Sequence, residues 1–545
     1  MAECCLKGGG MAARWDLREQ PWIPVRFMDG ATGRVGFREL FHRAHEIEDV
    51  ELPVPPAASG LLRVLAAMTA RVARVDGERL DDRELAEDIE DWLALRDRVL
   101  AQGRFDGKVV DAYFDDEVPC GRFDLFDAER PFLQDPRLRD ECLDAKGNAN
   151  PSGVNKLVFG RPTGVNGAVL FGHFTDGDPV PVPAAEATWH MIAQLYYGPS
   201  GQCTPRRITA DKPGNGLAGP LRKSVSFHVW AEDLFTTLVL AVPGPNDQID
   251  LDEADLCPWE EELPNPLAPP RPLTWPGRWL TGRARHAVLL EPSAGGTHVT
   301  DAYVTWSTHQ PPSAAPDPHV ILDMPKAGGA PFARAADQQR ALWRDLDALL
   351  LKDDGQGQRP LCFEYLPAQR LTDLRVRAYG FDQDGQQRDH GWFEATTPAV
   401  LGWLEGVSDE GDAMALHIAR CHQAAEQVGE RLEYAAKLAW KLATDPPEDT
   451  SAKVTLDRKR PGPWARTAMG HYWPAAERVF WQLATPQQLD APAYQPFVTA
   501  ALESLDAAMG AARADLRGAR ARSRARAALH AVIPHSQRTV TQSSR

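Results

Sequence analysis

A glycine-rich stretch is the first place in this sequence where residue types and spacing suggest chemistry. Gly214, Gly216 and Gly219 match the G-x-G-x-x-G pattern, in which bare backbone N–H groups approach a pyrophosphate at the start of a helix. The preceding residues, 206–213, do not form an apolar strand, and Pro220 follows where a helix should begin. We therefore predict against a dinucleotide site, and a nucleotide-dependent enzyme is kept only as the rival that a binding experiment must exclude.

Basic side chains flank the glycines closely. Cations beside bare backbone suit the approach of a phosphate or a base edge, whereas the plain alternative is a flexible surface loop. A second basic region lies near the C-terminus, where a solvated helix face is the alternative to a strip that holds a phosphate backbone. The candidate DNA-backbone residues are Arg206, Arg207, Lys212, Arg222, Lys223, Lys453, Arg458 and Lys459, with further arginines over 513–526.

Metal and catalytic patterns are weak by comparison. His417, Cys421 and His422 include an i,i+4 pair, but they have no partner cluster, so we interpret them as a core thiol beside surface histidines. The eight cysteines form no C-x-x-C motif and are interpreted as mostly buried thiols. The sequence carries no nucleophile elbow, zinc-protease helix, P-loop or EF-hand pattern. We expect no enzyme activity, no metal and no cofactor.

Composition limits the classes of protein further. The 545 residues carry a net charge of −16, which has the wrong sign for a protein that coats nucleic acid, so any DNA contact must be local. The longest apolar run, near 234–242, is far below the roughly 20 residues of a membrane span. Because the first residues also lack the pattern of a signal peptide, we expect a cytoplasmic chain without membrane contact.

The elements that must position these residues are mixed in the first part of the chain and helical in the second. Residues 1–14 are predicted to be a disordered extension, 15–395 a mixed α/β domain, and 396–545 a four-helix bundle, so the fold class is α+β. Apolar spacing predicts amphipathic helices over 61–72 and 81–95, and Asp384-Gly385 predicts a hairpin with its tip at 383–387. Further expected features are strands within 15–25 and near Val35, a Pro-rich irregular connection over 243–278, and helical segments at 414–421, 428–438, 475–483 and 498–509.

The order of several motifs resembles that of a known family. Trp15 to Val25 contains PWIPV, residues 123–134 read FDLFDAERPFLQ, and a Gly-rich loop and a terminal bundle follow. Together with a loop at 155–167, this combination resembles the CasA family, the large subunit of the type I-E CRISPR Cascade complex. The resemblance implies a subunit without catalysis that recognises the protospacer-adjacent motif in double-stranded DNA, promotes strand opening and recruits the helicase-nuclease. Its other implied partners are the guide RNA and the remaining Cascade subunits.

The resemblance also implies roles for individual residues. The family's DNA-reading glycine loop falls on Pro213 to Gly219, and its strand-separating glutamine wedge falls on Gln386 or Gln387. The loop that docks on the guide RNA and neighbouring subunits resembles the stretch from 155 to 166. The implied residues are therefore Gly214, Asn215, Gly216, Leu217, Ala218 and Gly219 at the DNA motif, and Asn155, Phe159, Arg161 and Asn166 at the guide.

Two departures from the family pattern affect these expectations. The lysine that reaches the DNA motif in a well-known member has no counterpart between Tyr303 and Thr308, where Trp306 stands instead. The preferred motif is therefore left open. The cysteine cluster of some members is missing from 250–285, so the sequence predicts no zinc.

Overall fold

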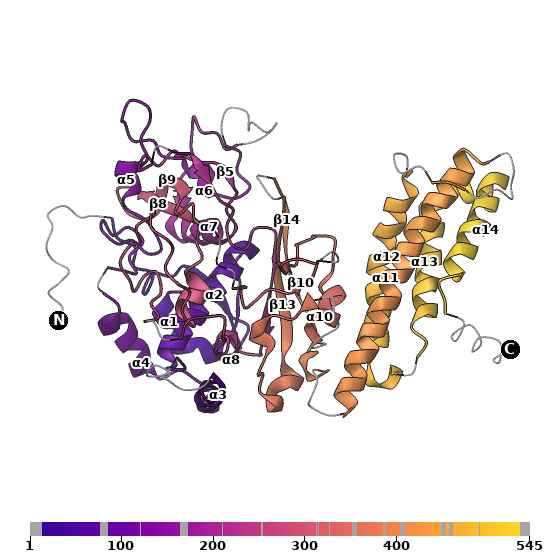
Figure 1. The fold of residues 1–545 in the computed structure, drawn as a ribbon, viewed down its shortest axis with the longest axis horizontal. Helices are drawn as coiled ribbons and strands as arrows, with labels where there is room; N and C mark the ends of the chain where they lie inside the picture. Colours follow the sequence, from indigo (N-terminus) through magenta and orange to yellow (C-terminus); the bar gives the residue numbers. More distant parts are fainter. Residues whose placement is uncertain are drawn as a thin grey trace. The chain divides into compact units, whose positions relative to one another are not determined.

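The computed structural model divides the chain into two compact units (Figure 1). The first comprises 1–342 and 355–402, and the second comprises 343–354 and 403–545. No helix in the part of the chain that the structure describes is long and apolar enough to cross a membrane. The described residues are 13–76, 85–119, 121–163, 173–209, 211–251, 254–311, 313, 315–325, 328–350, 357–384, 388–403, 409–447, 454–456, 461–489 and 491–534.

Small antiparallel sheets make up the strand content of the first unit. Their strand orders are β2-β1-β3, β4-β9-β8, β14-β13-β7, β11-β10-β12 and the pair β5-β6, and neighbouring strands in each sheet are antiparallel. The described strands therefore form no parallel sheet of the kind that binds dinucleotides. The strands are β1 (Ile23–Phe27), β2 (Thr32–Val35), β3 (Ile47–Val50), β4 (Val182–Pro183), β5 (Gly201–Gln202), β6 (Asn215–Gly216), β7 (Val225–Trp230), β8 (His286–Pro292), β9 (His298–Trp306), β10 (Leu322–Asp323), β11 (Phe332–Ala333), β12 (Gly357–Gln358), β13 (Arg375–Gln383) and β14 (Asp389–Thr396).

A fully buried helix, α2 (Pro55–Val72), runs through the core of this unit. We predicted an amphipathic helix here, but every residue of α2 is buried, including Arg63. The Arg63 guanidinium donates to both carboxylate oxygens of Asp317, at 2.9 and 2.7 Å, which compensates its burial. Gly60 allows α7 to pack closely, because a Cβ there would lie 2.6 Å from Ile192. The other helices are α1 (Phe37–Arg43), α3 (Leu85–Gln102), α4 (Gly107–Ala112), α5 (Leu138–Glu141), α6 (Val154–Leu157), α7 (Ala184–Tyr197), α8 (Leu234–Ala241) and α9 (Gly277–Thr281).

Turn and breaker residues predicted the local structure of the first unit well. The antiparallel strands β13 and β14 flank the Asp384-Gly385 signal, so the predicted strand pairing is confirmed, while residues 385–387 of the predicted tip lie outside the described residues. The predicted strands appear as β1 and β2. The described residues between α8 and α9 carry no regular helix or strand, as the Pro-rich composition indicated.

The predicted helical C-terminal region is confirmed, but its helices differ from those expected. The segments 414–421 and 428–438 belong to one 36-residue helix, α11 (Asp409–Thr444). The helix that the apolar spacing did not predict is the arginine-rich α14 (Leu516–His530). Its buried residues are mostly small: Gly518, Ala521, Ala525 and Leu529. Small residues give little apolar periodicity, so the buried face of α14 could not be predicted from the spacing of large apolar residues. The unit also contains α10 (Leu346–Leu350), α12 (Trp464–Leu483) and α13 (Tyr494–Met509).

The histidines of α11 are not at the surface, contrary to our interpretation. His417 is 2% exposed, and its Nε2 donates to the carbonyl oxygen of Leu483 at 2.9 Å. His422 is also largely enclosed, and its Nδ1 lies 2.8 Å from a carboxylate oxygen of Asp347. Cys421 is a buried thiol, as expected. Among the described residues, no group of three or more histidine, cysteine or acidic side chains is arranged so that it could hold a metal ion.

The ion pair of His422 predicts a stability effect that disappears at high pH. Burial alone would lower the pKa of His422, but Asp347 and Glu426 raise it to about 9. Because the pKa of an unfolded histidine is about 6.5, the folded state binds this proton more tightly. The stabilisation is complete below about pH 6.5 and is lost as the pH rises through about 9.

We therefore expect His422→Asn to reduce the unfolding free energy by about 2–3 kcal/mol at pH 6 and by much less at pH 10. Urea denaturation at several pH values measures this difference. His471→Asn, which changes an exposed histidine on α12, is the matched control. A deficit of equal size at both pH values would contradict the assignment.

Candidate nucleic-acid interface

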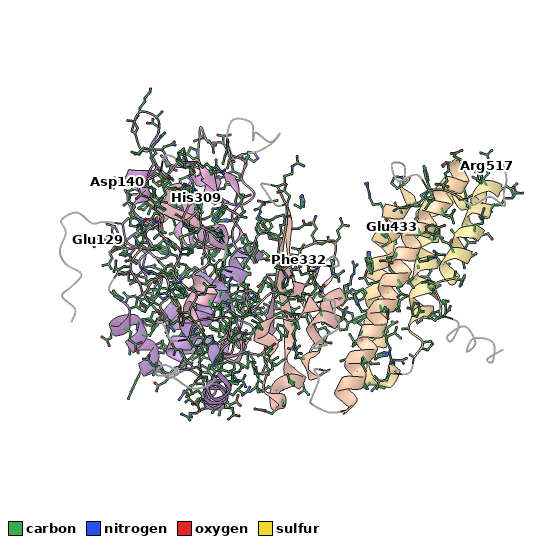
Figure 2. The ribbon with its side chains drawn as sticks, in the orientation of Figure 1. Glu129, Asp140, His309, Phe332, Glu433 and Arg517 are labelled. Atoms are coloured by element: carbon green, nitrogen blue, oxygen red, sulfur yellow. The ribbon has the colours of Figure 1, made fainter. Side chains whose placement is uncertain are left out.

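The glycine loop, Pro213–Gly219, is held against the end of β9. The indole Nε1 of Trp306 donates to the carbonyl oxygen of Pro213 at 2.7 Å, and the backbone N–H of Arg206 donates to the same oxygen at 2.9 Å. The ring Nε2 of His309 donates to the carbonyl oxygen of Asn215 at 2.9 Å. His309, labelled in Figure 2, lies in the part of the first unit that contains β5, β9 and α6 in Figure 1. Two β6 residues in the loop also pair with β5, so the loop has a defined backbone.

Arg206 lies inside the protein rather than at its surface. Its side chain is 0% exposed and forms ion pairs with Asp135 at 2.7 Å and with Glu141 at 2.6 Å. The guanidinium also lies over the Trp306 ring, 5.5 Å from its centroid. Arg206 is therefore a buried support of the glycine loop, and we remove it from the expected DNA contacts.

The C-terminal end of α7 holds the other end of the loop. The last carbonyl groups of a helix have no partner within the helix. Here the carbonyl oxygen of Tyr196 accepts the N–H of Leu221, and the carbonyl oxygen of Gly198 accepts the N–H of Gly219, both at 2.9 Å. The loop therefore completes the end of α7.

Arg222 connects this helix end to the β13–β14 hairpin. Its side chain is 3% exposed and forms an ion pair with Asp389 at 3.0 Å, at the first residue of β14. It also donates to the carbonyl oxygens of Tyr197 and Asp384, at 3.0 and 3.3 Å. Arg222 is thus a buried link between the loop and the mouth of the hairpin, and we remove it too from the expected DNA contacts.

The predicted wedge belongs to the segment between β13 and β14. The backbone of Asp384 and Arg388 closes the hairpin through an N–H to carbonyl bond of 2.9 Å. Gln386 and Gln387 lie outside the described residues, so their role stays a prediction. Asn166, Lys453, Arg458 and Lys459 also lie outside the described residues.

The predicted guide-docking residues are mostly packed against their own chain. Phe159 is 9% exposed and packs edge-on against Phe381 of β13, with 5.4 Å between ring centroids. Asn155 is buried and donates to Asp176 at 2.9 Å. Arg161 lies over the Phe174 ring and donates to the carbonyl oxygen of Val180 at 2.8 Å. Phe159 therefore connects this segment to the hairpin and does not stand free to stack on a base.

The three glycines of the loop differ in what requires them. A Cβ on Gly219 would lie 2.5 Å from the carbonyl oxygen of Tyr196, so packing at the end of α7 demands a glycine. A Cβ on Gly214 would lie 3.2 Å from the carbonyl oxygen of Cys203, which is tight. A Cβ on Gly216 would make only an ordinary contact of 3.7 Å with Cys203 Sγ. Packing within this chain therefore leaves the glycine at 216 unexplained.

Comparison with known families identifies the family of this chain. A profile of the family described as CRISPR-associated protein Cse1 matches residues 16–517, which is nearly the whole chain. The chain belongs to the Cse1 family. The resemblance to CasA that the sequence motifs indicated is confirmed.

Solved structures agree with the Cse1 assignment. A chain of a "CRISPR RNA-guided surveillance complex" is 38% identical, with a TM-score of 0.79 over 95% of this chain and 99% of that one. A chain of a pre-nicking surveillance complex is 40% identical, with a TM-score of 0.73 over 95% and 98%. Thermus thermophilus CasA (Cse1), at 21% identity, shares the fold with a TM-score of 0.66 over 96% and 99%. No curated protein sequence matches.

The side chains that this Cse1 chain leaves exposed around the loop are few. Lys212 and Lys223 are exposed, and each has a positive φ, of 50° and 68°. Arg207 is exposed as well, and its Nε donates to the carbonyl oxygen of Leu143. Asn215 is exposed at the tip of the loop. These residues are the surface that the loop offers to a polyanion.

Sequence reasoning missed one residue at this surface and misjudged another. His309 is exposed beside Asn215, but a single histidine after a strand carries no pattern that would single it out. Trp306 stands where a DNA-reaching lysine was sought, yet it is 0% exposed and supports the loop from within. The two side chains differ in how they contact the loop: Trp306 bonds to Pro213 from within the protein, and His309 bonds to Asn215 at the surface.

The glycine analysis predicts that the same substitution destabilises the protein at one position and has almost no effect on its stability at the other. Gly219→Ala should lower the unfolding free energy by about 1–3 kcal/mol, because the new methyl group overlaps the backbone of Tyr196. Gly216→Ala, its matched control, should change the unfolding free energy by less than about 0.5 kcal/mol. Urea denaturation of both variants tests this, and equal destabilisation would contradict the packing argument.

Proposed function

We propose that this Cse1 chain, as the large subunit of a CRISPR surveillance complex, recognises the protospacer-adjacent motif in double-stranded target DNA. It then promotes opening of the target strands and recruits the helicase-nuclease, without catalysis of its own. The observation that carries the proposal is the geometry of a cation-flanked loop that exposes Asn215 at its tip and is joined through buried Arg222 to a hairpin mouth. The proposal is supported by the two similar chains of 38% and 40% identity, which come from structures described as CRISPR RNA-guided surveillance complexes.

Recognition is proposed to take place at the tip of the glycine loop. Asn215 can donate to the purine N3 and pyrimidine O2 acceptors of the minor groove, and the neighbouring His309 adds a polar group at the same tip. Readout of this groove is degenerate, so tolerance of several motifs follows. Lys212 and Lys223, with Arg207, would hold the adjacent phosphates.

Strand opening is assigned to the hairpin. Gln386 or Gln387 would enter beside the motif and replace the hydrogen bonds of an unpaired base, at an unstacking cost of a few kcal/mol. The Arg222–Asp389 ion pair, at 3.0 Å, would keep this tip at a constant distance from the loop. Recognition and opening could then occur in a single binding event.

Contact with the guide RNA and neighbouring subunits is proposed for the segment around α6. Arg161 retains partial exposure and would hold a phosphate of the guide. Phe159 would act by positioning the segment against β13, since its ring packs on Phe381. Asn155 and Asn166 belong to the same proposed docking segment.

An add-back experiment tests the proposal. A guide-loaded complex that lacks its large subunit is assayed for duplex binding at 0.15 M salt, with and without this chain, on targets with intact or scrambled flanking motifs. We expect the chain to restore binding to the motif-bearing duplex by at least tenfold over the scrambled one. If the chain restored binding to both targets equally, it would act as a scaffold that does not recognise the motif. Thermal stabilisation by a dinucleotide would instead favour the rival enzyme.

The exposed lysines predict a specific change in salt dependence. Lys212→Gln with Lys223→Gln should reduce the slope of log K against log salt concentration by about 2, because each phosphate contact contributes about 0.9. Both targets should weaken equally, since phosphates carry no sequence information. Arg104→Gln with Lys108→Gln, two exposed cations outside the proposed interface, is the charge-matched control. An unchanged slope would remove these lysines from the interface.

A further inference from the structure

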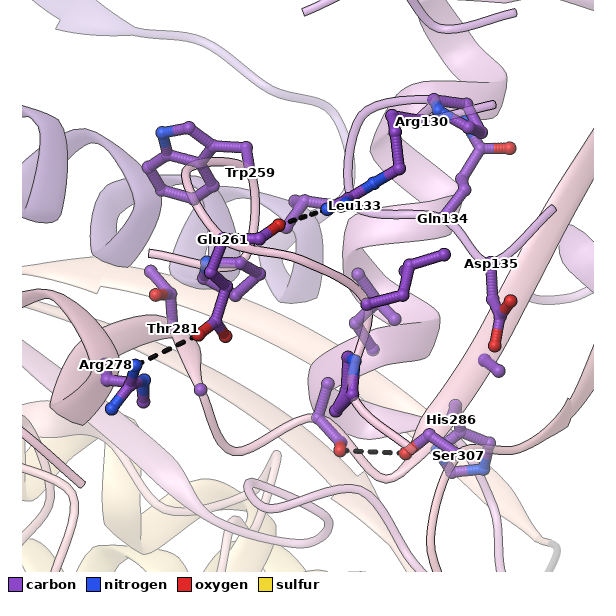
Figure 3. A pocket seen from close by; sticks show the side chains of 18 of the residues that line it. Arg130, Leu133, Gln134, Asp135, Trp259, Glu261, Arg278, Thr281, His286 and Ser307 are labelled. Carbon is purple, nitrogen blue, oxygen red and sulfur yellow. Dashed lines mark hydrogen bonds and ion pairs between the residues drawn. The ribbon is translucent and has the colours of Figure 1, made fainter. Parts of the chain in front are cut away.

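A cavity of about 180 Å³ lies in the first unit and is not part of the proposed interface (Figure 3). Its lining includes Arg130, Pro131, Leu133 and Gln134, which belong to the ERPFLQ segment of the sequence. The remaining wall comes from the end of α7, the Pro-rich connection, α9 and the start of β8. The segment that helped to reveal the family therefore also shapes a space to which the proposed function gives no role.

The walls of the cavity are apolar. Trp259 and Tyr196 line the cavity with aromatic carbon, and their polar atoms are already bonded: the indole N–H of Trp259 donates to the Tyr113 hydroxyl at 2.8 Å, and the Tyr196 hydroxyl donates to the carbonyl oxygen of Leu280 at 3.2 Å. Leu133 and Leu195 add aliphatic surface. An apolar cavity of about 150 Å³ is large enough to hold benzene, so this cavity can hold a molecule with a single aromatic ring.

The rim and floor carry an unusual concentration of arginines. Each of three carboxylates is shared by two guanidinium groups: Glu262 by Arg122 and Arg130, Glu261 by Arg271 and Arg278, and Asp135 by Arg137 and Arg206. Figure 3 shows Arg130 and Arg278 reaching Glu261 from two sides. Glu141 is a further partner of Arg206. Five of these six arginines, all but Arg206, line the cavity, and these five share three carboxylates.

One donor in this cluster has no acceptor. The Nε–H of Arg278 is buried and makes no hydrogen bond among the described residues, although its side chain is only 8% exposed. A buried donor without a partner carries an uncompensated desolvation cost unless a ligand or water accepts from it. Burial and the charge of Arg122 also lower the pKa of Arg130, which a bound anion would counteract.

The backbone at the cavity is strained as well. Leu133 has a φ of +56°, a left-handed conformation that is unfavourable for a residue with a Cβ. This places an exceptional residue directly in the wall of the space. Strain of this kind collects at sites that hold ligands.

From these observations we infer that the cavity binds a small organic anion, an aromatic carboxylate or an aryl phosphate, with its ring against Trp259 and its charged group among the arginines. The apolar walls account for the ring, and the uncompensated positive charge and the free Arg278 N–H account for the anion. Arg137 and Arg271, which are partly exposed, stand at the rim where such a ligand enters.

The test uses the full chain in the absence of DNA, so its outcome is independent of the proposed function. Binding of 4-fluorobenzoate is followed by ¹⁹F NMR and isothermal titration calorimetry, with competition by benzoate and phenyl phosphate. Neutral 4-fluorobenzyl alcohol is the ligand control. We expect saturable binding at one site per chain, and binding of the alcohol at least tenfold weaker, because it lacks the charge.

Two variants locate the site. Arg278→Met removes the guanidinium and keeps the apolar stem, and Ala284→Leu fills the cavity without changing any charge; each should weaken 4-fluorobenzoate binding at least tenfold. Arg375→Met, at an exposed arginine on β13, is the charge-matched control and should bind as the original chain does. The Ala284 variant decides the matter if the Arg278 variant fails to fold. Absence of saturable binding, equal binding of the alcohol, or full binding by Ala284→Leu would overturn the inference.

Discussion

The unpaired carbonyl groups at the end of α7 are the constraint on which the candidate interface depends. Every helix ends with carbonyls that need outside donors, and here the donors come from the segments that carry the proposed function. The glycine loop supplies the N–H groups of Gly219 and Leu221, and Arg222 supplies its guanidinium to Tyr197. The hairpin adds the amide of Gln383, 3.4 Å from the same Tyr197 oxygen. The same hydrogen bonds therefore satisfy the end of α7 and position the candidate site. Neither the glycine loop nor the hairpin can shift without leaving buried carbonyl groups unpaired.

Two buried arginines make this arrangement rigid. Arg206 and Arg222 hold opposite ends of the glycine loop, and each pairs with a carboxylate from a distant part of the chain. Removing a partner from a buried ion pair costs about 3–5 kcal/mol, because it leaves a charge without compensation. A loop held in this way can present Asn215 in one geometry, which a reader of base edges requires. The ion pairs thus give the loop specificity of position, even though the stability gained from burying such pairs is small.

The sequence predicted what depends on neighbouring residues and failed where distant ones decide. The Asp-Gly turn signalled the β13–β14 hairpin, and the Pro-rich composition signalled the irregular connection, because both act over a few residues. The burial of Arg206 depends on Asp135 and Glu141, 71 and 65 residues earlier, and that of Arg222 depends on Asp389. No local pattern distinguishes these arginines from Lys212 or Lys223. The burial of all of α2 was hidden similarly, since Arg63 finds its partner, Asp317, 254 residues away.

The division of the cations into buried and exposed ones bears on the proposed contact with DNA, because the chain as a whole carries a net charge of −16. At physiological salt, charges beyond about 8 Å are largely screened, so the many distant carboxylates have little influence on a phosphate at the loop. What a phosphate experiences there is the local set, in which Arg206 and Arg222 are neutralised by carboxylates and Arg207, Lys212 and Lys223 are exposed. Few exposed cations give weak attraction for DNA in general. Under the proposed function, tight binding would require that the base edges also fit the loop, and discrimination would follow from this requirement because phosphate contacts alone are insufficient.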